Sequence, residues 1–255
     1  YTTKEEVLIE ALPYIQKYER TVFVIKYGGA AMTDPGLKET FAKDVTLLRK
    51  IGIDVVIVHG GGKETTTIAQ RLGIPSRFVD GQRYTDEPML QVVLMVLAGS
   101  LNKEIVRLIN RWGGNAVGLC GVDHSLLQAR RQTSAGVDLG LVGEITAVNT
   151  TFLRLLLENT LMPVLAPIGL GADGIVYNIN ADLAAAVVAQ ALNAEKLVYL
   201  SDVEGVVIED RLVSTLGKSE AAELIRTGKI SGGMIPKLQS AFESVQSGVR
   251  KVHIV

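Results

Sequence analysis

Short apolar runs alternate along this chain with longer segments of helical periodicity. Residues 22–26 and 54–59 each contain four consecutive apolar residues, and they are followed by amphipathic segments at 35–52 and 63–73. Continuous apolar strands that alternate with helices are typical of a parallel sheet covered by helices on both faces. The pattern therefore predicts an α/β fold built on such a sheet.

The same alternation continues to the end of the chain. A helix at about 3–18 carries an apolar stripe and should be kinked by Pro13, and residues 87–110 are expected to form one long buried helix. Residues 78–85 are expected to be an extended loop or a hairpin. Further strands are predicted at 116–121, 126–132, 141–148, 162–169, 174–179, 195–202 and 251–255, and further helices at 150–160, 181–193, 218–227 and 233–247.

Two features of the pattern bear on how the chain is organised. The helix at 3–18 precedes the first strand, so its apolar stripe is expected either to pack on its own domain or to reach another subunit. We predict an approximate boundary between two lobes near residue 170, in the segment GLGADG. The chain stops within a predicted strand, which is an unusual place for a domain of this class to end.

The composition is that of a globular enzyme. Of 255 residues, 47% are hydrophobic and 21% are charged, and the formal net charge is −1. We predict no nucleic-acid partner, because that would need clustered Lys and Arg, and no membrane span, because that needs about 20 consecutive apolar residues. Cys120 is the only cysteine and the N-terminus lacks a secretion-signal pattern, so a cytoplasmic protein is expected.

Two glycine clusters lie at the carboxyl ends of predicted strands. These are KYGG at Lys26–Gly29 and HGGG at His59–Gly62. Ligands of open α/β sheets bind at that edge, and glycines there let backbone N–H groups approach phosphate oxygens. Tight turns without a ligand are the alternative. Two clusters, one of them beginning with a lysine, favour an anion site.

Other polar residues could contribute to such a site. Lys237 occurs near the start of a predicted helix, where an acidic residue would be favoured. Asn178 and Asn180 fall on alternate positions of an extended segment and so face the same way, and Asp182 follows them. Arg83 has the planar fork that grips a carboxylate in two places. Taken singly, each of these residues is also explained by surface exposure, turn chemistry or helix capping.

Several familiar motifs are absent or out of context. Residues 60–66, GGGKETT, lack the leading glycine and the Lys-Ser/Thr pair of a P-loop. The segment 169–174 matches GxGxxG but leads into a strand, so it is interpreted as a turn. His59 is expected to order its turn, while His124 and His253 have no predicted partner, and no zinc-binding pattern of Cys and His is found.

An ordered set of motifs extends over nearly the whole chain: VIKYGGAAM, VIVHGGGKE, DGQRYTD, DLGLVGEI, YNINAD, LSDVEGV and ISGGMIPK. In this order they resemble the N-acetylglutamate kinases of the amino-acid kinase family, in the arginine-sensitive group with an N-terminal helix. The resemblance implies a three-layer αβα sandwich with a mainly parallel central sheet. It also implies an oligomerisation helix at 1–20, an acyl-acceptor lobe at 21–170 and an ATP-binding lobe at 171–255.

The resemblance further implies roles for the residues that match these motifs. Lys26 and Lys237 would neutralise the phosphoryl group during transfer, and Asp182 would hold both lysines in place. Substrate-binding residues would be Gly61, Gly62, Arg83, Asn178 and Asn180, and ATP-binding residues would be Gly28, Gly29, Gly60, Ser201, Asp202 and Gly205. No residue is expected to hold a metal directly, because Mg²⁺ would be held mainly by ATP.

The implied reaction transfers the γ-phosphoryl group of ATP to the side-chain carboxylate of N-acetyl-L-glutamate, the second step of arginine biosynthesis. A carboxylate with a pKa of about 4 is already ionised at neutral pH, so no general base is required. Catalysis then needs positioning and fixed positive charge. A lysine at a strand end, followed by glycine amides, supplies both, which is the physical sense of VIKYGG.

The resemblance also extends to assembly and regulation. The kinked N-terminal helix implies a homo-oligomer, a dimer or preferably a ring-shaped hexamer, and it raises an arginine effector and a PII-type regulatory protein as hypotheses. Lys63 stands where the family usually has proline, and residues 121–124, GVDH, replace the more usual GKDG. The family also continues beyond residue 255, which implies a C-terminally truncated ATP lobe.

Two other functions remain open at this point. A related amino-acid or carbamate kinase could phosphorylate a different acceptor, since pocket shape decides that choice. A catalytically silent arginine-sensing domain, of the kind attached to acetylglutamate synthases, would be expected to lose the lysines or glycines. Lys26, Lys237, Asp182 and both glycine clusters are intact in this sequence, which favours the kinase.

Overall fold

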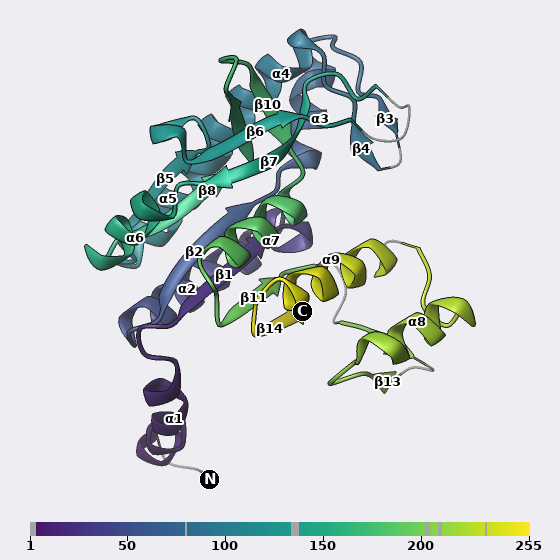
Figure 1. The fold of residues 1–255 in the computed structure, drawn as a ribbon. Coiled ribbons are helices and arrows are strands. Elements are labelled where there is room, and N and C mark those ends of the chain that lie inside the picture. The colour runs from purple at the N-terminus through teal and green to yellow at the C-terminus, as the bar shows by residue number, and fades with distance from the viewer. Residues whose placement is uncertain (1–3, 80, 134–137, 202–204, 209–210, 233) are drawn as a thin grey trace.

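A computed structural model of the chain describes residues 4–79, 81–133, 138–201, 205–208, 211–232 and 234–255. Its centre is a six-stranded sheet in the order β14-β11-β1-β2-β8-β5, and every neighbouring pair is parallel (Figure 1). The strands are β1 (Val22–Tyr27), β2 (Asp54–His59), β5 (Ala116–Cys120), β8 (Met162–Ala166), β11 (Lys196–Tyr199) and β14 (Lys251–Ile254). The predicted parallel sheet is confirmed.

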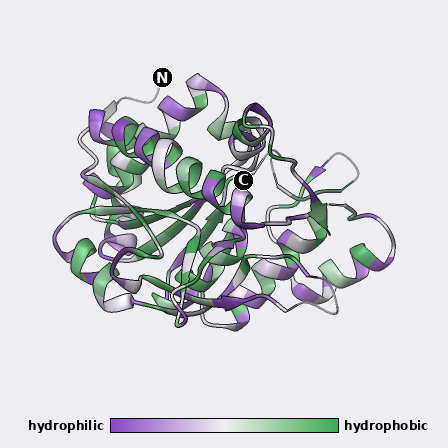
Figure 2. Cartoon of the chain, turned by 90° about the horizontal axis from the view of Figure 1, so that it is seen from above, coloured by the Kyte–Doolittle hydropathy of each residue, from purple (hydrophilic) through white to green (hydrophobic). Residues whose placement is uncertain are grey.

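Helices cover both faces of this sheet, so the predicted αβα sandwich is also confirmed (Figures 1 and 2). One face packs against α2 (Pro35–Lys50) and α5 (Asn102–Arg111), and the other against α6 (Thr150–Glu158), α7 (Ala181–Ala191) and α9 (Met234–Gln246). Alternate residues of a strand point to opposite faces. Phe23 and Ile25 accordingly join one buried cluster, whereas Val24 joins the other.

Four further strands close into a small barrel beside the sheet. The barrel contains β6 (Leu127–Arg131), β7 (Val142–Val148), β9 (Ile168–Gly171) and β10 (Val176–Ile179), in the order β10-β7-β6-β9. The sequence predicted β6, β7 and β10, but not the closure of the barrel. It was wrong about β9: residues 162–169 were expected to form one strand and 169–174 a turn, whereas Pro167 separates β8 from β9 and the turn begins only after Gly171. The lobe boundary near residue 170 falls in the β9–β10 hairpin, and the division into lobes stays a prediction. The barrel aims the end of β10 at the carboxyl edge of the central sheet.

The long helix predicted at 87–110 runs without a break but is not uniform. It consists of α4 (Glu87–Val93), a π-helical segment η2 (Leu94–Leu101) and α5. Such segments are rare and occur frequently at functional sites. The side chains of Leu97 and Leu101 lie directly beneath the glycine turn after β2, where a Cβ on Gly61 would collide with both of them.

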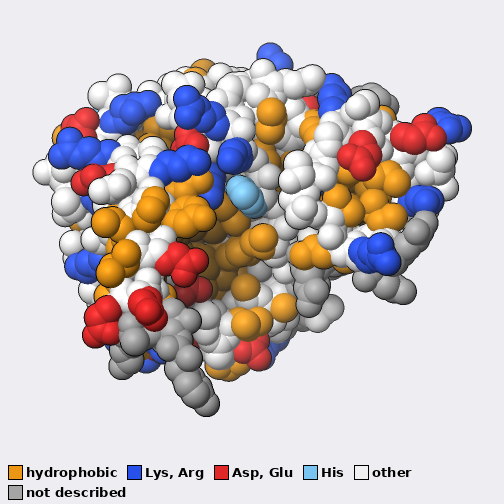
Figure 3. Space-filling model, turned by 90° about the horizontal axis from the view of Figure 1, so that it is seen from below, with side chains coloured by type: hydrophobic (Ala, Val, Ile, Leu, Met, Phe, Trp, Pro, Cys, Tyr) orange, Lys and Arg blue, Asp and Glu red, His pale blue; other side chains and the backbone are white. Residues whose placement is uncertain are grey.

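The first helix, α1 (Lys4–Tyr18), extends away from the rest of the molecule (Figure 1). Leu8 and Ile9 are 68% and 70% exposed, so these two residues are not covered by the described part of the chain, whereas Tyr18 at the end of the helix packs against Phe23. Apolar side chains also surround a hollow on the underside of the molecule (Figure 3). Among the described residues, no helix combines the length and apolar character needed to cross a membrane.

The C-terminal region adds a small satellite core. A hairpin of β12 (Val207–Ile208) and β13 (Arg211–Leu212), which the sequence did not predict, lies with α8 (Lys218–Arg226) beside α9. Val206, Ile230 and Leu238 are the buried centre of this unit. It places the N-terminal turn of α9, and with it Lys237, close to the carboxyl edge of the sheet.

Candidate active site

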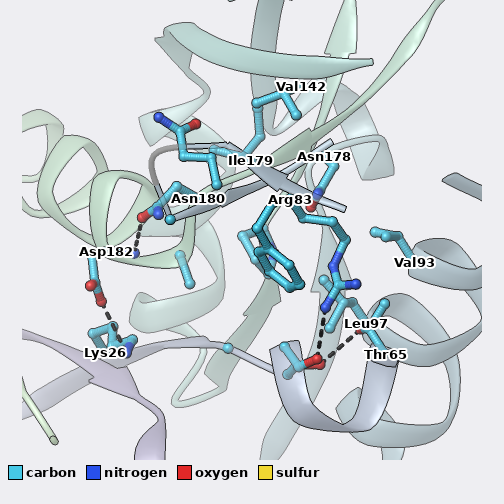
Figure 4. Close-up of a pocket in the computed structure, with 18 residues that line it drawn as sticks. Lys26, Thr65, Arg83, Val93, Leu97, Val142, Asn178, Ile179, Asn180 and Asp182 are labelled. Atoms are coloured by element: carbon cyan, nitrogen blue, oxygen red, sulfur yellow. Dashed lines mark hydrogen bonds and ion pairs between the residues drawn. The ribbon is translucent and has the colours of Figure 1, made fainter. Parts of the chain in front are cut away.

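A pocket of about 230 Å³ lies at the carboxyl ends of β1 and β2, between the sheet and the barrel (Figure 4). It is formed by the turns after these two strands, the hairpin of β3 (Phe78–Val79) and β4 (Gln82–Arg83), and the junction of β10 with α7. Eight of the predicted site residues line it: Lys26, Gly60, Gly61, Gly62, Arg83, Asn178, Asn180 and Asp182.

Two lysines from distant parts of the chain meet at one carboxylate beside this pocket. Lys26 Nζ lies 2.9 Å from Asp182 Oδ1, and Lys237 Nζ lies 3.7 Å from Asp182 Oδ2. The lysine side chains are only 12% and 21% exposed, so their charges are less screened than surface charges. The structure thus brings all three predicted catalytic residues together, although their roles in a reaction stay predictions.

Gly28 makes room for the Lys26 side chain. A Cβ at this position would lie 2.5 Å from Lys26 Nζ and 3.0 Å from Cε. The Gly28 backbone is extended, with φ −167°, which any residue can adopt. The glycine is therefore required for space and not for its conformational freedom, because the lysine side chain folds back over it.

The turn after β2 presents free backbone donors to the pocket. Gly60 N–H donates to the carbonyl of Tyr27 at 2.8 Å, which ties the ends of β1 and β2 together. Gly61 has φ +151° and precedes α3 (Gly62–Arg71). Within the described part of the chain, the N–H groups of Gly61 and Gly62 have no acceptor. Together with the positive end of the α3 dipole, they form a site suited to an anion.

Arg83 is held firmly on the opposite wall. It is 8% exposed, Nη1 donates to Ser76 Oγ at 3.0 Å, and Nη2 donates to Gly62 O and Thr66 Oγ1, both at 2.8 Å. Its guanidinium also stacks on the ring of Phe78. Burial lowers the pKa of Arg83, but the group stays cationic because its ordinary pKa is far above neutrality. Nε–H and one Nη1–H are left for a ligand.

The two asparagines of the β10–α7 junction have different local partners. Asn178 Nδ2 donates to Thr85 Oγ1 at 3.1 Å, and the buried Thr85 hydroxyl donates to the carbonyl of Arg83 at 3.0 Å. Asn180 caps α7, because its Oδ1 accepts from Asp182 N at 2.9 Å and from Leu183 N at 3.1 Å. The cap places Asp182 in the first helical turn, where the helix dipole favours a carboxylate.

The residues predicted to contact ATP are less closely grouped. Gly28 and Gly60 adjoin the pocket, and Gly29, with φ +67°, opens a short 3₁₀ turn. Ser201 is not on the pocket wall, and its N–H donates to Val255 O at 2.7 Å. Gly205 lines a separate cavity of about 580 Å³, formed with the β13 and β14 region. Asp202 lies outside the described residues.

The sequence model of the amino acid kinase family matches residues 21–255, and this range contains every residue of the site. The chain belongs to the amino acid kinase family.

Close relatives within this family share one name. Acetylglutamate kinase from Chlorobium luteolum is 55% identical over 250 residues, which are 98% of this chain and 82% of the relative. Acetylglutamate kinase from Thermoanaerobacter sp. is 48% identical over 256 residues, 99% of this chain and 85% of the relative. The similarity therefore extends over the N-terminal helix as well as the kinase fold.

Solved structures of other proteins show the same fold. N-acetylglutamate synthase from Neisseria gonorrhoeae, complexed with coenzyme A and N-acetyl-glutamate, superposes with a TM-score of 0.88 at 27% identity, over 99% of this chain and 58% of that one. The protein smu.665 from Streptococcus mutans gives 0.81 at 30% identity, over 91% and 94%. Carbamate kinase from Giardia lamblia gives 0.67 at 18% identity, over 92% of each chain, which supports the fold alone.

In this amino acid kinase, several pocket residues were not found by sequence reasoning. They are Thr65, Phe78, Gly81, Gln82, Val93, Leu97, Val142, Pro167, Ile179 and Ala181. Five of them lie within the motifs that carry the resemblance: Gly81 and Gln82 in DGQRYTD, Val142 in DLGLVGEI, and Ile179 and Ala181 in YNINAD. Other residues, such as Val93 and Leu97, occur in ordinary core patterns and reach the pocket through the tertiary fold. No cluster of three His, Cys, Asp or Glu side chains able to hold a metal ion occurs among the residues that the structure describes.

Proposed function

We propose that this protein transfers the γ-phosphoryl group of ATP to the side-chain carboxylate of N-acetyl-L-glutamate. The products are an acyl phosphate and ADP, and the reaction is the second step of arginine biosynthesis. The proposal is supported by the relatives named acetylglutamate kinase, which are 48–55% identical over nearly the whole chain. The observation that carries it is the meeting of Lys26 and Lys237 at Asp182, beside a pocket that also holds Arg83.

The pocket chemistry suits an in-line transfer between two anions. A carboxylate oxygen forms a bond to the γ-phosphorus, the bond to the β–γ bridging oxygen breaks, and its electron pair stays on ADP. The acceptor needs no deprotonation. The two ammonium groups would neutralise the phosphoryl group, and the free N–H groups of Gly61 and Gly62 would bind its oxygens. Mg²⁺ would enter as part of the nucleotide substrate.

The shape of the pocket suits an acid with two carboxylates. Arg83 and Lys26 lie on opposite sides of the cavity (Figure 4), and Val93, Leu97 and Val142 contribute apolar side chains to its lining. Arg83 would bind the α-carboxylate, while the side-chain carboxylate would point towards Lys26. Asn178 would contact the remaining polar atoms of the acylated amino acid.

Assembly and regulation belong to the same proposal. The exposed apolar residues of α1 support a homo-oligomer, a dimer or a hexamer, in which this helix contacts another subunit. Arginine as an effector, a PII-type regulatory protein and a cytoplasmic location stay predictions from the sequence resemblance.

The proposal can be tested by measuring ADP release from ATP and Mg²⁺ with and without N-acetyl-L-glutamate. Unacetylated glutamate, aspartate, aminoadipate and carbamate serve as competing acceptors. We expect N-acetyl-L-glutamate to give the highest kcat/KM. Faster turnover with another acceptor would assign the protein to a different kinase reaction. Binding of arginine with no acceptor-dependent ADP release would instead indicate a non-catalytic sensing domain.

A further inference from the structure

A buried polar cluster adjoins the glycine turn, and neither His59 nor Asn102, its two buried members, lines the pocket. His59 and Asn102 are both 0% exposed. His59 Nδ1 lies 2.8 Å from the carbonyl oxygen of Gly60, and His59 Nε2 lies 3.1 Å from Asn102 Nδ2. Burying polar groups costs free energy of folding unless their hydrogen bonds are complete. A fully hydrogen-bonded cluster beside the glycine turn therefore points to a role in the fold or in the reaction.

The partners fix the direction of every hydrogen bond in the cluster. A carbonyl oxygen only accepts, so the proton of the imidazole is on Nδ1, and Nε2 accepts from Asn102. The second amide hydrogen of Asn102 goes to Val164 O at 2.9 Å. Asn102 Oδ1 accepts from Lys103 Nζ at 3.1 Å. Donors therefore run in one direction, from the exposed Lys103 ammonium through Asn102 and His59 to Gly60 O. We call these three residues the relay.

A glycine on a neighbouring strand makes space for the relay. Gly118 lies in the middle of β5, where glycine weakens a strand and often marks a close approach of other groups. A Cβ on Gly118 would overlap Asn102 Oδ1 and lie 2.8 Å from Lys103 Nζ. The Gly118 carbonyl also accepts from Lys103 Nζ at 3.0 Å. Strand β5 thus leaves space for the side chain of Asn102 and supplies a hydrogen-bond acceptor for Lys103.

We propose that the Lys103–Asn102–His59 relay is a positioning device that turns the Gly60–Gly61 peptide so that its N–H faces the transferred phosphoryl group. In a trans peptide the C=O and N–H point in opposite directions, and the described residues contain no cis peptide bond. Holding Gly60 O against the buried imidazole therefore directs Gly61 N–H away from His59, and both Gly60 and Gly61 line the pocket whereas His59 does not. The inference rests on the proposed kinase function.

The direction of the relay also strengthens the donor that it positions. Aligned hydrogen bonds polarise one another, and an accepting carbonyl makes the N–H of the same peptide a better donor. Burial lowers the pKa of His59 to about 4, so the ring is neutral at pH 7. Leu97 and Leu101 support Gly61 from below. The Gly61 amide is therefore oriented before any ligand binds, which is the property required of an anion-stabilising donor.

The first test needs no substrate. In protein labelled with ¹⁵N-histidine, long-range ¹H–¹⁵N correlation distinguishes a protonated ring nitrogen from an unprotonated one. The His59→Asn spectrum, which lacks one of the three histidines, assigns the signals. We expect His59 to carry its proton on Nδ1 alone at about pH 7. A ring protonated on Nε2, or on both nitrogens, overturns the relay whatever the activity of the protein.

The second test compares two substitutions of His59. Asparagine places an amide where Nδ1 lies and can still donate to Gly60 O, whereas glutamine reaches the Nε2 position and leaves Gly60 O without its donor. We expect His59→Gln to lower kcat about tenfold, with KM for both substrates changed less than about threefold. His59→Asn should recover most of that loss. Gly118→Ala, in a strand outside the pocket, should lower kcat in the same direction because it displaces Asn102.

The possible outcomes distinguish a failure of the relay proposal from a failure of the proposed kinase function. A kcat in His59→Gln equal to that of the parent protein overturns the positioning role. Equal losses in folded His59→Gln and His59→Asn, with melting temperatures as the check on folding, also overturn it. A parent protein without acceptor-dependent ADP release overturns the proposed function and the catalytic purpose of the relay, while the NMR result still decides whether the relay itself exists.

Discussion

Lys26 Nζ lies 2.9 Å from Oδ1 of Asp182, an ion pair that joins the first strand of the sheet to the first turn of α7. The second oxygen of the same carboxylate is 3.7 Å from Lys237 Nζ, a looser contact. Lys26 is thereby fixed in place, whereas Lys237, on α9, can follow a negative charge that moves through the site. The asymmetry predicts that Lys237 acts mainly on the transition state.

Lys237→Ala should lower kcat by about a hundredfold or more and leave KM for ATP and for the acid within about threefold. The reason is that the lost charge interacts most strongly with the phosphoryl group during transfer. Steady-state kinetics with each substrate varied in turn measures this. Lys218→Ala, an exposed lysine in the first turn of α8, is the matched control and should behave like the parent protein. An unchanged kcat in Lys237→Ala would remove this lysine from the mechanism.

Gly28→Ala tests the space that Lys26 occupies. The added Cβ would lie 2.5 Å from Nζ, so the ammonium must shift away from its position on Asp182. Because the clash is with the end of a flexible side chain, we expect a folded protein with kcat lowered about tenfold. Gly217→Ala, at a position where a Cβ meets nothing within 4 Å, is the control. Equal kcat values for these two variants would contradict the prediction.

The comparison of sequence with structure shows which features are encoded locally. Lys26 and residues 60–62 could be predicted because they end apolar strands whose direction in a parallel sheet is fixed. The barrel could not, since the patterns that predict β6, β7 and β10 as strands do not specify their partners, and β9 was not distinguished from β8. Asn102 gave no signal within a long helix. Its burial results from contacts with His59 and Gly118, which are distant in the sequence.

Arg83→Lys should raise KM for N-acetyl-L-glutamate about tenfold or more and change kcat and the KM for ATP little. A guanidinium offers several N–H groups in a fixed plane, and in Arg83 three of them are engaged by Gly62, Thr66 and Ser76. A lysine is a point charge that cannot keep these contacts and also bind a carboxylate. Arg71→Lys on the exposed end of α3 is the control. A variant in which only the ATP dependence shifted would contradict the assignment of Arg83 to the acceptor.

The buried imidazole of His59 predicts a loss of stability in acid. Its folded-state pKa is lowered to about 4 from an ordinary value of 6.5, chiefly by burial. Below pH 6.5 the unfolded chain takes up a proton that the folded protein does not, so the free energy of unfolding falls as the pH falls towards 4. The His59 contribution to this loss between about pH 7.5 and about pH 5 is about 2 kcal/mol.

Urea unfolding at these two pH values measures this contribution as a difference between variants. His59→Asn should lose about 2 kcal/mol less on acidification than the parent protein, because asparagine does not titrate. His124→Asn is the control, since His124 is exposed and its left-handed backbone, with φ +51°, is well tolerated by asparagine. Equal acid sensitivity of His59→Asn and the parent protein would mean that the imidazole is not buried in its neutral form.

The exposed helix α1 predicts an assembly that depends on its apolar residues. Leu8 and Ile9 are 68% and 70% exposed, a degree of exposure that is unfavourable for adjacent large aliphatic side chains unless another surface covers them. We expect Leu8→Glu with Ile9→Glu to reduce the oligomer mass seen by analytical ultracentrifugation. Because α1 extends away from the rest of the molecule (Figure 1) and none of its described residues lines the pocket, kcat of the smaller species should stay within about twofold of the parent value. The same substitutions at Leu47 and Leu72, which are exposed at single positions elsewhere, should leave the mass unchanged. An unaltered mass in the α1 variant would show that Leu8 and Ile9 do not hold subunits together.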